Sequence, residues 1–215
     1  MKLFIANQNY SSWSLRAWVI FAQYNLEPEV VKLKLFTEEF YQVLKEVTPA
    51  AKVPALVDGD LKLWDSLAIL EYINEAYLDN QAWPSDPSER AVARAISAEM
   101  HSGFTHIRND LPMNCRAQRK VDLSSDVLKE IARIDEIWST QMAQYPDGWL
   151  FGEWSIADAM YAPVALRFKT YGIELSEGAK RYQQKQFESA AIQRWLEEAS
   201  SETDIVELDE AGTDI

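Results

Sequence analysis

The chain has 215 residues, of which 47% are hydrophobic and 12% aromatic, so it can bury a substantial core and is not disordered as a whole. Its formal net charge of −13 argues against a nucleic-acid partner and against an anionic membrane surface, because both are bound through concentrated Lys and Arg. No apolar run approaches the roughly 18 residues of a membrane-spanning helix, and the single cysteine, Cys115, forbids a disulfide within the chain and predicts a reducing, cytoplasmic location.

Strand and helix patterns alternate along the first part of the chain. Lys2–Ala6 is a short apolar run typical of a buried strand, and apolar residues then recur at helical spacing after Ser11. Residues 29–35 alternate apolar and charged side chains as a strand does, and a second helical pattern follows. An Asp58-Gly59 turn between two short apolar runs predicts a hairpin, which another helix follows. The order βαβαββα predicts a thioredoxin-like domain over residues 1–79, with helices on both faces of a mixed sheet.

The rest of the chain contains helical patterns and predicts an all-helical domain. Asp86-Pro87-Ser88-Glu89 is a strong helix start, and an apolar stripe continues from it to Leu111. Ser155-Ile156-Ala157-Asp158 is a further capping box. More helices are expected from Ser124 or Ser125, around 177–187 and over 189–198. We expect a linker at 80–88, a helical bundle over 89–201, and a flexible tail over 202–215, which holds six acids and no base.

Two motifs near the hairpin indicate a binding site. Val53-Pro54-Ala55-Leu56 places a proline directly before an apolar strand, and Asp65-Ser66 stands where a strand hands over to a helix, a place where free backbone N–H groups gather. With the apolar helix that follows, these residues resemble the glutathione-binding half of the glutathione S-transferase family. The resemblance implies a cis bond before Pro54, glutathione held by the backbone of Val53, and its γ-glutamyl end held by Asp65 and Ser66. Lys52 is a candidate partner for the glycyl carboxylate.

A motif in the second half is similar to the same family. Gly152, Ser155-Ile156-Ala157-Asp158 and Pro163 resemble the Gly…Ser-x-Ala-Asp…Pro signature of the family's helical domain. Its role is structural, because Ser155 and Asp158 satisfy each other's backbone donors at the start of a buried helix. The resemblance covers nearly the whole chain outside the acidic tail. It implies the glutathione S-transferase architecture, glutathione as co-substrate and a homodimer.

A serine-rich turn lies between the first strand and the first helix, where the family activates the glutathione thiol. The run Ser11-Ser12-Trp13-Ser14-Leu15-Arg16 is similar to the Ser-Ser-Cys-Ser-x-Arg stretch of zeta-type transferases. The resemblance implies Ser11 as the activating residue, with Ser12 next and Tyr10 as a rival, since other branches use tyrosine. Trp13 replaces the cysteine of the zeta type, which disfavours isomerase chemistry. Without the resemblance, these serines are ordinary helix caps.

The second substrate is expected to meet the first helix of the helical domain, together with Tyr10 and Trp13. His101, Phe104, Thr105 and Arg108 stand at i, i+3, i+4 and i+7, so they share one face of a continuous helix. Arg108 would attract an anionic substrate, and His101 would orient or protonate one near neutral pH. The alternative is a solvated or interdomain face.

The sequence lacks the residue patterns that several other chemistries require. His101 and His106 are five apart, about 140° around a helix, so they do not converge on a metal. The absence of a Cys-x-x-Cys motif excludes thioredoxin-type redox chemistry, and Cys115 is interpreted as an ordinary buried thiol. The resemblance implies a glutathione transferase in which the glutathione thiolate attacks a small electrophile. The alternatives are a glutathione-dependent isomerase and a non-catalytic binding or recruitment protein.

Overall fold

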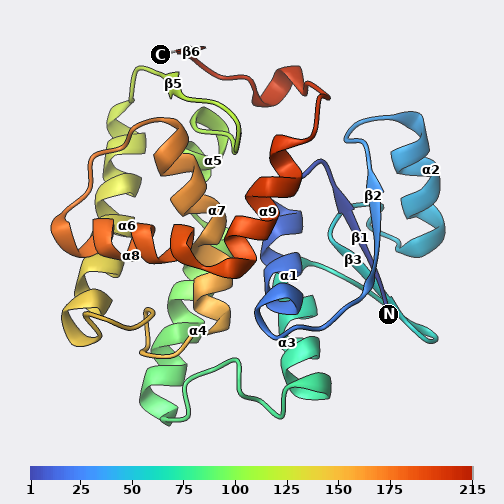
Figure 1. Cartoon of the computed structure of the whole chain (residues 1–215), viewed down its shortest axis with the longest axis horizontal. Coiled ribbons are helices and arrows are strands. Elements are labelled where there is room, and N and C mark those ends of the chain that lie inside the picture. Colours follow the sequence, from blue (N-terminus) through green and yellow to red (C-terminus); the bar gives the residue numbers. More distant parts are fainter. Residues whose placement is uncertain (215) are drawn as a thin grey trace.

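A mixed sheet with helices on both faces forms the N-terminal part of the computed structural model, which describes residues 1–214 (Figure 1). Its strand order is β2-β1-β3-β4, with β1 parallel to β2 and antiparallel to β3, and with β3 antiparallel to β4. The elements are β1 (Lys2–Ala6), α1 (Ser12–Gln23), β2 (Glu29–Leu33), α2 (Glu38–Val47), β3 (Ala55–Asp58), β4 (Leu61–Trp64) and α3 (Ser66–Tyr77). This is the predicted βαβαββα order of a thioredoxin-like domain.

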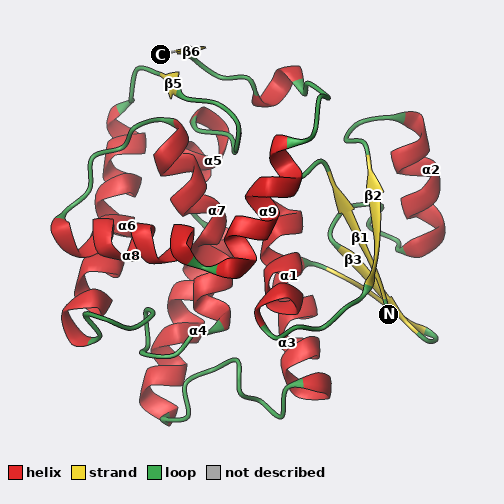
Figure 2. Ribbon diagram, viewed as in Figure 1, coloured by secondary structure: helices red, strands yellow, loops and turns green. Residues whose placement is uncertain are grey.

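Alternation along β1 explains why helices cover both faces of the sheet. Successive strand side chains point to opposite faces. Leu3 and Ile5 enter the main core with residues of α1 and α3, whereas Phe4 and Ala6 enter a smaller cluster with residues of α2. Figure 2 shows α2 on the outer side of the sheet and α1 and α3 on the side of the helical bundle. The loop after β1 therefore opens between the sheet and the bundle.

The C-terminal part is helical, as predicted. Its elements are α4 (Pro87–Ser102), α5 (Thr105–Asp110), β5 (Arg119–Lys120), α6 (Ser125–Gln144), α7 (Ile156–Thr170), α8 (Glu177–Glu188), α9 (Ala190–Ser200), the short 3₁₀ helix η1 (Glu207–Asp209) and β6 (Thr213–Asp214). None of the helices described within residues 1–214 is long and apolar enough to cross a membrane.

Helix α7 lies at the centre of the structure and carries the predicted capping box. The Ser155 backbone N–H and hydroxyl both donate to Asp158 Oδ2, at 2.8 and 3.0 Å. Every residue of α7 except Lys169 is buried, and the helix packs against both α1 and α4. The Arg16 side chain on α1 donates to the Met160 carbonyl at 3.1 Å. The two halves of the chain therefore share one continuous core.

The predicted continuous helix to Leu111 is wrong, because the chain breaks between α4 and α5. Phe104 adopts a left-handed conformation with φ of 57°, and the Gly103 N–H closes the end of α4 on the Glu99 carbonyl. A Cβ at Gly103 would lie 2.8 Å from that carbonyl oxygen, so only glycine fits. His101, Phe104, Thr105 and Arg108 consequently do not share one helical face. Gly103 is the local signal for this helix stop.

The predicted flexible tail is also corrected over its described residues, while Ile215 lies outside them. Glu202 accepts hydrogen bonds from the backbone of the β1–α1 loop, and Asp204 pairs with Lys34 at 2.8 Å. Strand β6 pairs antiparallel with β5. The acidic side chains, which suggested that the tail would fray, instead bind backbone N–H groups and basic side chains of the rest of the protein.

Candidate functional site

Two adjoining cavities lie where the sheet meets the helical bundle. The Ser66 cavity, of about 330 Å³, is lined by Trp13, Ala50, Lys52, Val53, Pro54, Trp64, Asp65, Ser66 and His101. The Ser11 cavity, of about 620 Å³, has walls from the serine turn, from the β2–α2 region and from α5 and α7. They share Trp13, Ala50, Lys52 and Val53. A ligand long enough to enter both cavities would pass these four residues.

The predicted glutathione-binding residues line the Ser66 cavity together. The bond between Val53 and Pro54 is cis, and Ala55 after it begins β3. Lys52 is exposed at the mouth and lines both cavities. The structure therefore brings Lys52, Val53, Pro54, Asp65 and Ser66 together around one cavity.

Asp65 and Ser66 place polar side chains at the start of α3. Asp65 has a φ of 78°, and its Oδ1 caps the helix by accepting from Leu67 and Ala68. Its Oδ2 lies 3.0 Å from His101 Nε2 on α4. The Ser66 side-chain oxygen is buried and, among residues 1–214, has no hydrogen-bond partner. Buried hydroxyls are normally hydrogen-bonded, so this one is a ready contact for a ligand.

The serine turn forms one wall of the Ser11 cavity. Ser11 precedes α1, and its Oγ lies 2.7 Å from the Oγ of Ser14, which accepts from the Ala6 N–H. Ser12 Oγ accepts a hydrogen bond of 3.0 Å from Arg167 Nη2. Because Ser12 acts as acceptor there, its own proton is free to be donated to a ligand. Both predicted serines thus line the cavity at the N-terminus of α1.

Tyr10 contributes its ring to this cavity, but its hydroxyl is engaged elsewhere. The hydroxyl donates to Glu210 Oε1 at 2.5 Å and accepts from Arg116 Nη2 at 3.2 Å. Burial and the hydrogen bond to Glu210 raise the pKa of Tyr10. This geometry argues against Tyr10 as the activating hydroxyl.

Trp13 lies between two arginine side chains. The Cζ atoms of Arg16 and Arg108 are 4.4 and 4.8 Å from the centre of its ring. The His101 ring meets the Trp13 ring edge-on, and the two ring centres are 5.5 Å apart. Arg108 also donates to the carbonyl oxygens of Met100, His101 and Gly103 at the end of α4. The indole therefore holds the α4–α5 break against the serine turn.

Three arginines make this region electropositive. Arg108 and Arg167 line the Ser11 cavity, and Arg16 lies close enough for their charges to act on it. Burial, followed by the charge of Arg108, lowers the pKa of Arg167 to about 10, so it remains protonated at neutral pH. Such a cluster favours a ligand with a negative charge.

The remaining predicted substrate contacts divide into two groups. His101 lines the Ser66 cavity and Arg108 the Ser11 cavity. Phe104 instead belongs to the hydrophobic core, and Thr105 is exposed and lines neither cavity. Neither Phe104 nor Thr105 therefore lines the two cavities, and the chain breaks at these residues between α4 and α5.

Sequence reasoning missed several residues of the Ser11 cavity. These are Leu35, Phe36, Phe40, Tyr41, Ala50, Ala51, Asn109, Arg167 and Asp209. Arg167 had a usable signal, because an arginine inside the apolar run of α7 is seldom buried without a role. The aromatic residues of α2 follow an ordinary amphipathic pattern and gave no such signal. No group of three or more His, Cys, Asp or Glu within residues 1–214 is placed to hold a metal ion.

Comparison with known proteins bears on both halves of the chain. Residues 1–75 match the family model of the glutathione S-transferase N-terminal domain, and residues 91–198 match that of the C-terminal domain. A probable maleylacetoacetate isomerase of Caenorhabditis elegans is 29% identical over 171 residues, covering 77% of this chain and 78% of that protein. A stringent starvation protein A homolog of Pasteurella multocida is 28% identical over 174 residues, covering 79% and 77%.

Solved structures share the fold. A Burkholderia glutathione transferase homolog with bound glutathione superposes with a TM-score of 0.72 at 21% identity, covering 94% of this chain and 98% of that one. A bacterial maleyl pyruvate isomerase of the zeta class gives a TM-score of 0.72 at 20% identity, covering 95% and 100%. At these identities, the structural likeness supports the architecture rather than a particular reaction.

Proposed function

Since this chain belongs to the glutathione S-transferase family, we propose that it joins glutathione, through its thiolate sulfur, to a small, negatively charged electrophile. One observation carries the proposal. The cavity lined by Ser11 and Ser12 shares Lys52 and Val53 with the cavity in which the Ser66 hydroxyl has no partner. One tripeptide that passes Lys52 and Val53 would therefore reach both the binding motif and the serine turn.

Glutathione is proposed to bind with its γ-glutamyl end in the Ser66 cavity. The Ser66 hydroxyl would bond the γ-glutamyl carboxylate, and the Asp65 carboxylate the amino group beside it. The Val53 backbone would pair with the cysteinyl residue, and Lys52 with the glycyl carboxylate. His101, which is paired with Asp65, closes this cavity from the helical side.

The division that we propose is a glutathione-binding domain over 1–79, a linker over 80–88 and a substrate domain over 89–201.

Ser11 is proposed to activate the thiol, with Ser12 as the second donor. A free thiol has a pKa of about 8.5 and is mostly protonated at neutral pH. A hydroxyl hydrogen bond, the N-terminus of α1 and the nearby arginine charges all favour the thiolate. The thiolate then attacks a carbon of the electrophile. With a chlorinated aromatic, the C–S bond forms, the C–Cl bond breaks, and chloride leaves with the electron pair.

The electrophile is proposed to combine an acidic group with an apolar body. Arg108 and Arg167 stand on the helical side of the Ser11 cavity, and Phe36, Phe40 and Tyr41 stand on the side of α2. Guanidinium groups favour carboxylates, and aromatic rings favour flat apolar surfaces. The two walls together select for an acidic aromatic or unsaturated molecule.

A glutathione-dependent isomerase is the second candidate, and the name of the nematode relative favours it. Glutathione would add to a double bond, rotation would follow, and elimination would return the thiol, so that no glutathione is consumed. Trp13 stands where the zeta-type sequence has cysteine, which separates this chain from that type. A recruitment protein is the third reading. Consumption of glutathione separates the transferase from both alternatives, and conversion of a substrate without that consumption separates the isomerase from the recruitment protein.

Assembly and location are proposed on other residues. Exposed apolar side chains on β4, α3 and α4 support a homodimer, because such surfaces usually mark an interface. They are Leu61, Trp64, Tyr77 and Val92. A cytoplasmic location agrees with the single, unpaired Cys115.

Retention on glutathione resin and turnover of a generic chlorinated aromatic test this function, with wild type compared with Ser11→Ala and Ser12→Ala. The proposal expects retention of all three proteins and reduced turnover in at least the Ser11 variant. Retention without wild-type turnover would favour a non-catalytic binder or an enzyme of narrow specificity such as the isomerase, and the absence of retention would favour the recruitment protein.

A further inference from the structure

The acidic C-terminal segment, residues 202–214, forms hydrogen bonds with the loop that carries the serine turn. Figure 1 shows the chain leaving α9 and running across the top of the view towards β5. Residues 7–10 lie between β1 and Ser11, and each of them contacts this segment. Asp204 accepts from the Asn7 side chain at 3.3 Å, and Glu210 accepts from the Tyr10 hydroxyl. Glu202 accepts hydrogen bonds from the backbone of Gln8 and Asn9, the two residues between Asn7 and Tyr10.

The Glu202 carboxylate binds two consecutive backbone groups of this loop. Its Oε1 accepts from the Gln8 N–H at 2.8 Å and its Oε2 from the Asn9 N–H at 3.0 Å. The Glu202 side chain is only 10% exposed, and Lys32 on β2 lies 3.5 Å from Oε1. Charge-assisted hydrogen bonds of this kind fix both position and orientation. A residue more than 190 positions later therefore anchors two backbone groups immediately before the serine turn.

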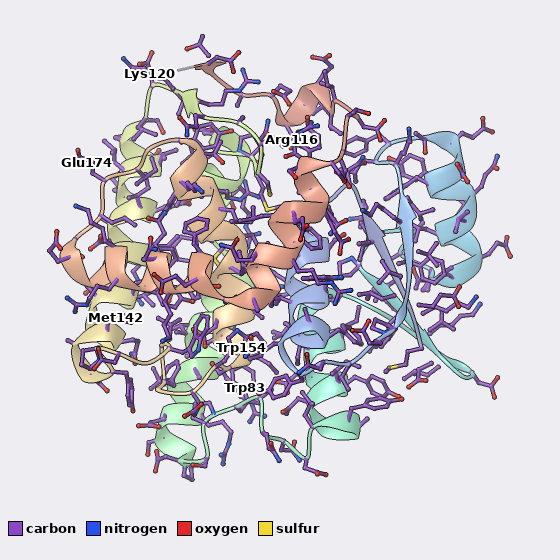
Figure 3. All side chains as sticks on the ribbon, viewed as in Figure 1. Trp83, Arg116, Lys120, Met142, Trp154 and Glu174 are labelled. Atoms are coloured by element: carbon purple, nitrogen blue, oxygen red, sulfur yellow. The ribbon has the colours of Figure 1, made fainter. Side chains whose placement is uncertain are left out.

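Arg116 ties the same segment to the helical half. It donates to the carbonyl oxygens of Glu202 and Asp204 and to the Tyr10 hydroxyl. In Figure 3, Arg116 is labelled beside the ribbon of the C-terminal segment. Glu210 in turn accepts from Asn114 Nδ2 at 3.0 Å. The segment is consequently held from both sides.

The segment also reaches the substrate cavity itself. Asp209, in η1, lines the Ser11 cavity with Arg108 and Arg167. The C-terminal segment therefore contributes a carboxyl group to the wall of this cavity.

We propose that residues 202–214 are a working part of the catalytic site, in which Glu202 is a positioning residue for Ser11 and Ser12. This inference rests on the proposed function. Glu202 contacts neither glutathione nor the electrophile. It orients the backbone that presents the two hydroxyls, whereas the residues proposed to bind glutathione lie on other elements. Losing Glu202 should therefore reduce the chemical step and leave glutathione binding intact.

The test uses full-length Glu202→Ala and Glu202→Gln proteins, with Glu207→Ala as the matched control. Glu207 is an exposed acid of the same segment. With the chlorinated aromatic, Glu202→Ala should lose about tenfold or more in kcat, since small misplacements of catalytic groups have effects of this size. Its KM for glutathione should stay within about twofold of wild type. Glu202→Gln should keep more activity, because its amide oxygen still accepts a hydrogen bond.

Amide hydrogen exchange at residues 8 and 9 gives a readout that does not need turnover. Both amides should lose protection in Glu202→Ala and keep it in Glu207→Ala. Wild-type kcat in a folded Glu202→Ala protein, or unchanged protection of both amides, would overturn the inference. If Glu202→Ala does not fold, full activity and full protection in Glu202→Gln would overturn it. If the wild type neither turns over substrate nor binds glutathione resin, the proposed function fails, and exchange alone decides whether Glu202 holds the loop.

Discussion

Arg167 Nη2 on α7 donates a hydrogen bond of 3.0 Å to Ser12 Oγ, a residue 155 positions earlier in the chain. The same guanidinium donates to the carbonyl oxygen of Leu111. One buried cation thus joins the serine turn to the helical half and faces the Ser11 cavity. Both its charge and its position are open to direct tests.

Replacing Arg167 with methionine should affect acidic electrophiles more than neutral ones. A hydrogen bond to a charged group contributes about 1.5–3 kcal/mol, so kcat/KM for an acidic chlorinated aromatic should fall about tenfold to a hundredfold. The loss for a neutral counterpart should be smaller. Lys169→Met, on the exposed position of the same helix, is the control. An equal loss with both substrates would contradict the proposed role of the charge.

Ser66→Ala should separate stability from binding. The Ser66 hydroxyl is buried without a partner, so removing it should leave the free energy of unfolding unchanged or raise it by up to about 1 kcal/mol. Glutathione affinity should fall about tenfold, because the ligand loses that hydroxyl. Calorimetric titration and thermal unfolding measure the two effects. A destabilised protein with normal affinity would show that the hydroxyl serves the fold.

Elements with a local chemical signature could be predicted from the sequence. The capping box of Ser155 and Asp158 depends on residues that are three positions apart. The motif of Pro54 followed by Asp65-Ser66 spans a single hairpin. The approach of Arg167 to Ser12 depends on how α7 packs against α1, which no local pattern encodes. The acidic tail was misjudged for the same reason, because its cations lie on distant elements. Only the stop at Gly103 had a local signal that was overlooked.

Asp158 should make stability depend on pH. Burial raises the pKa of its carboxyl from 3.8 to about 6 in the folded protein, so the folded state holds this proton more tightly than the unfolded state. The contribution of Asp158 to the unfolding free energy should therefore fall as pH rises from about 4 to about 6, by at most about 3 kcal/mol. Urea unfolding of wild type and Asp158→Asn across this range gives the difference. A difference that grows with pH would contradict the assignment.

Gly103→Ala should disturb the break between α4 and α5. The added Cβ would meet the Glu99 carbonyl oxygen at 2.8 Å, and overpacking of this kind costs about 1–3 kcal/mol. Arg108 donates to the Gly103 carbonyl, so KM for the acidic electrophile should rise as well. The exposed neighbour Ser102→Ala should change stability by no more than about 0.5 kcal/mol. Equal melting temperatures for the two variants would show that the helices tolerate a side chain there.

Titration of the glutathione thiol on the protein tests the central claim most directly. The ultraviolet absorbance of the thiolate, followed against pH, gives the pKa of the bound thiol in wild type, Ser11→Ala and Ser12→Ala. The account predicts a wild-type midpoint clearly below the free value of about 8.5, and a return towards that value when Ser11 is replaced. A wild-type midpoint at the free value, with glutathione bound, would contradict it.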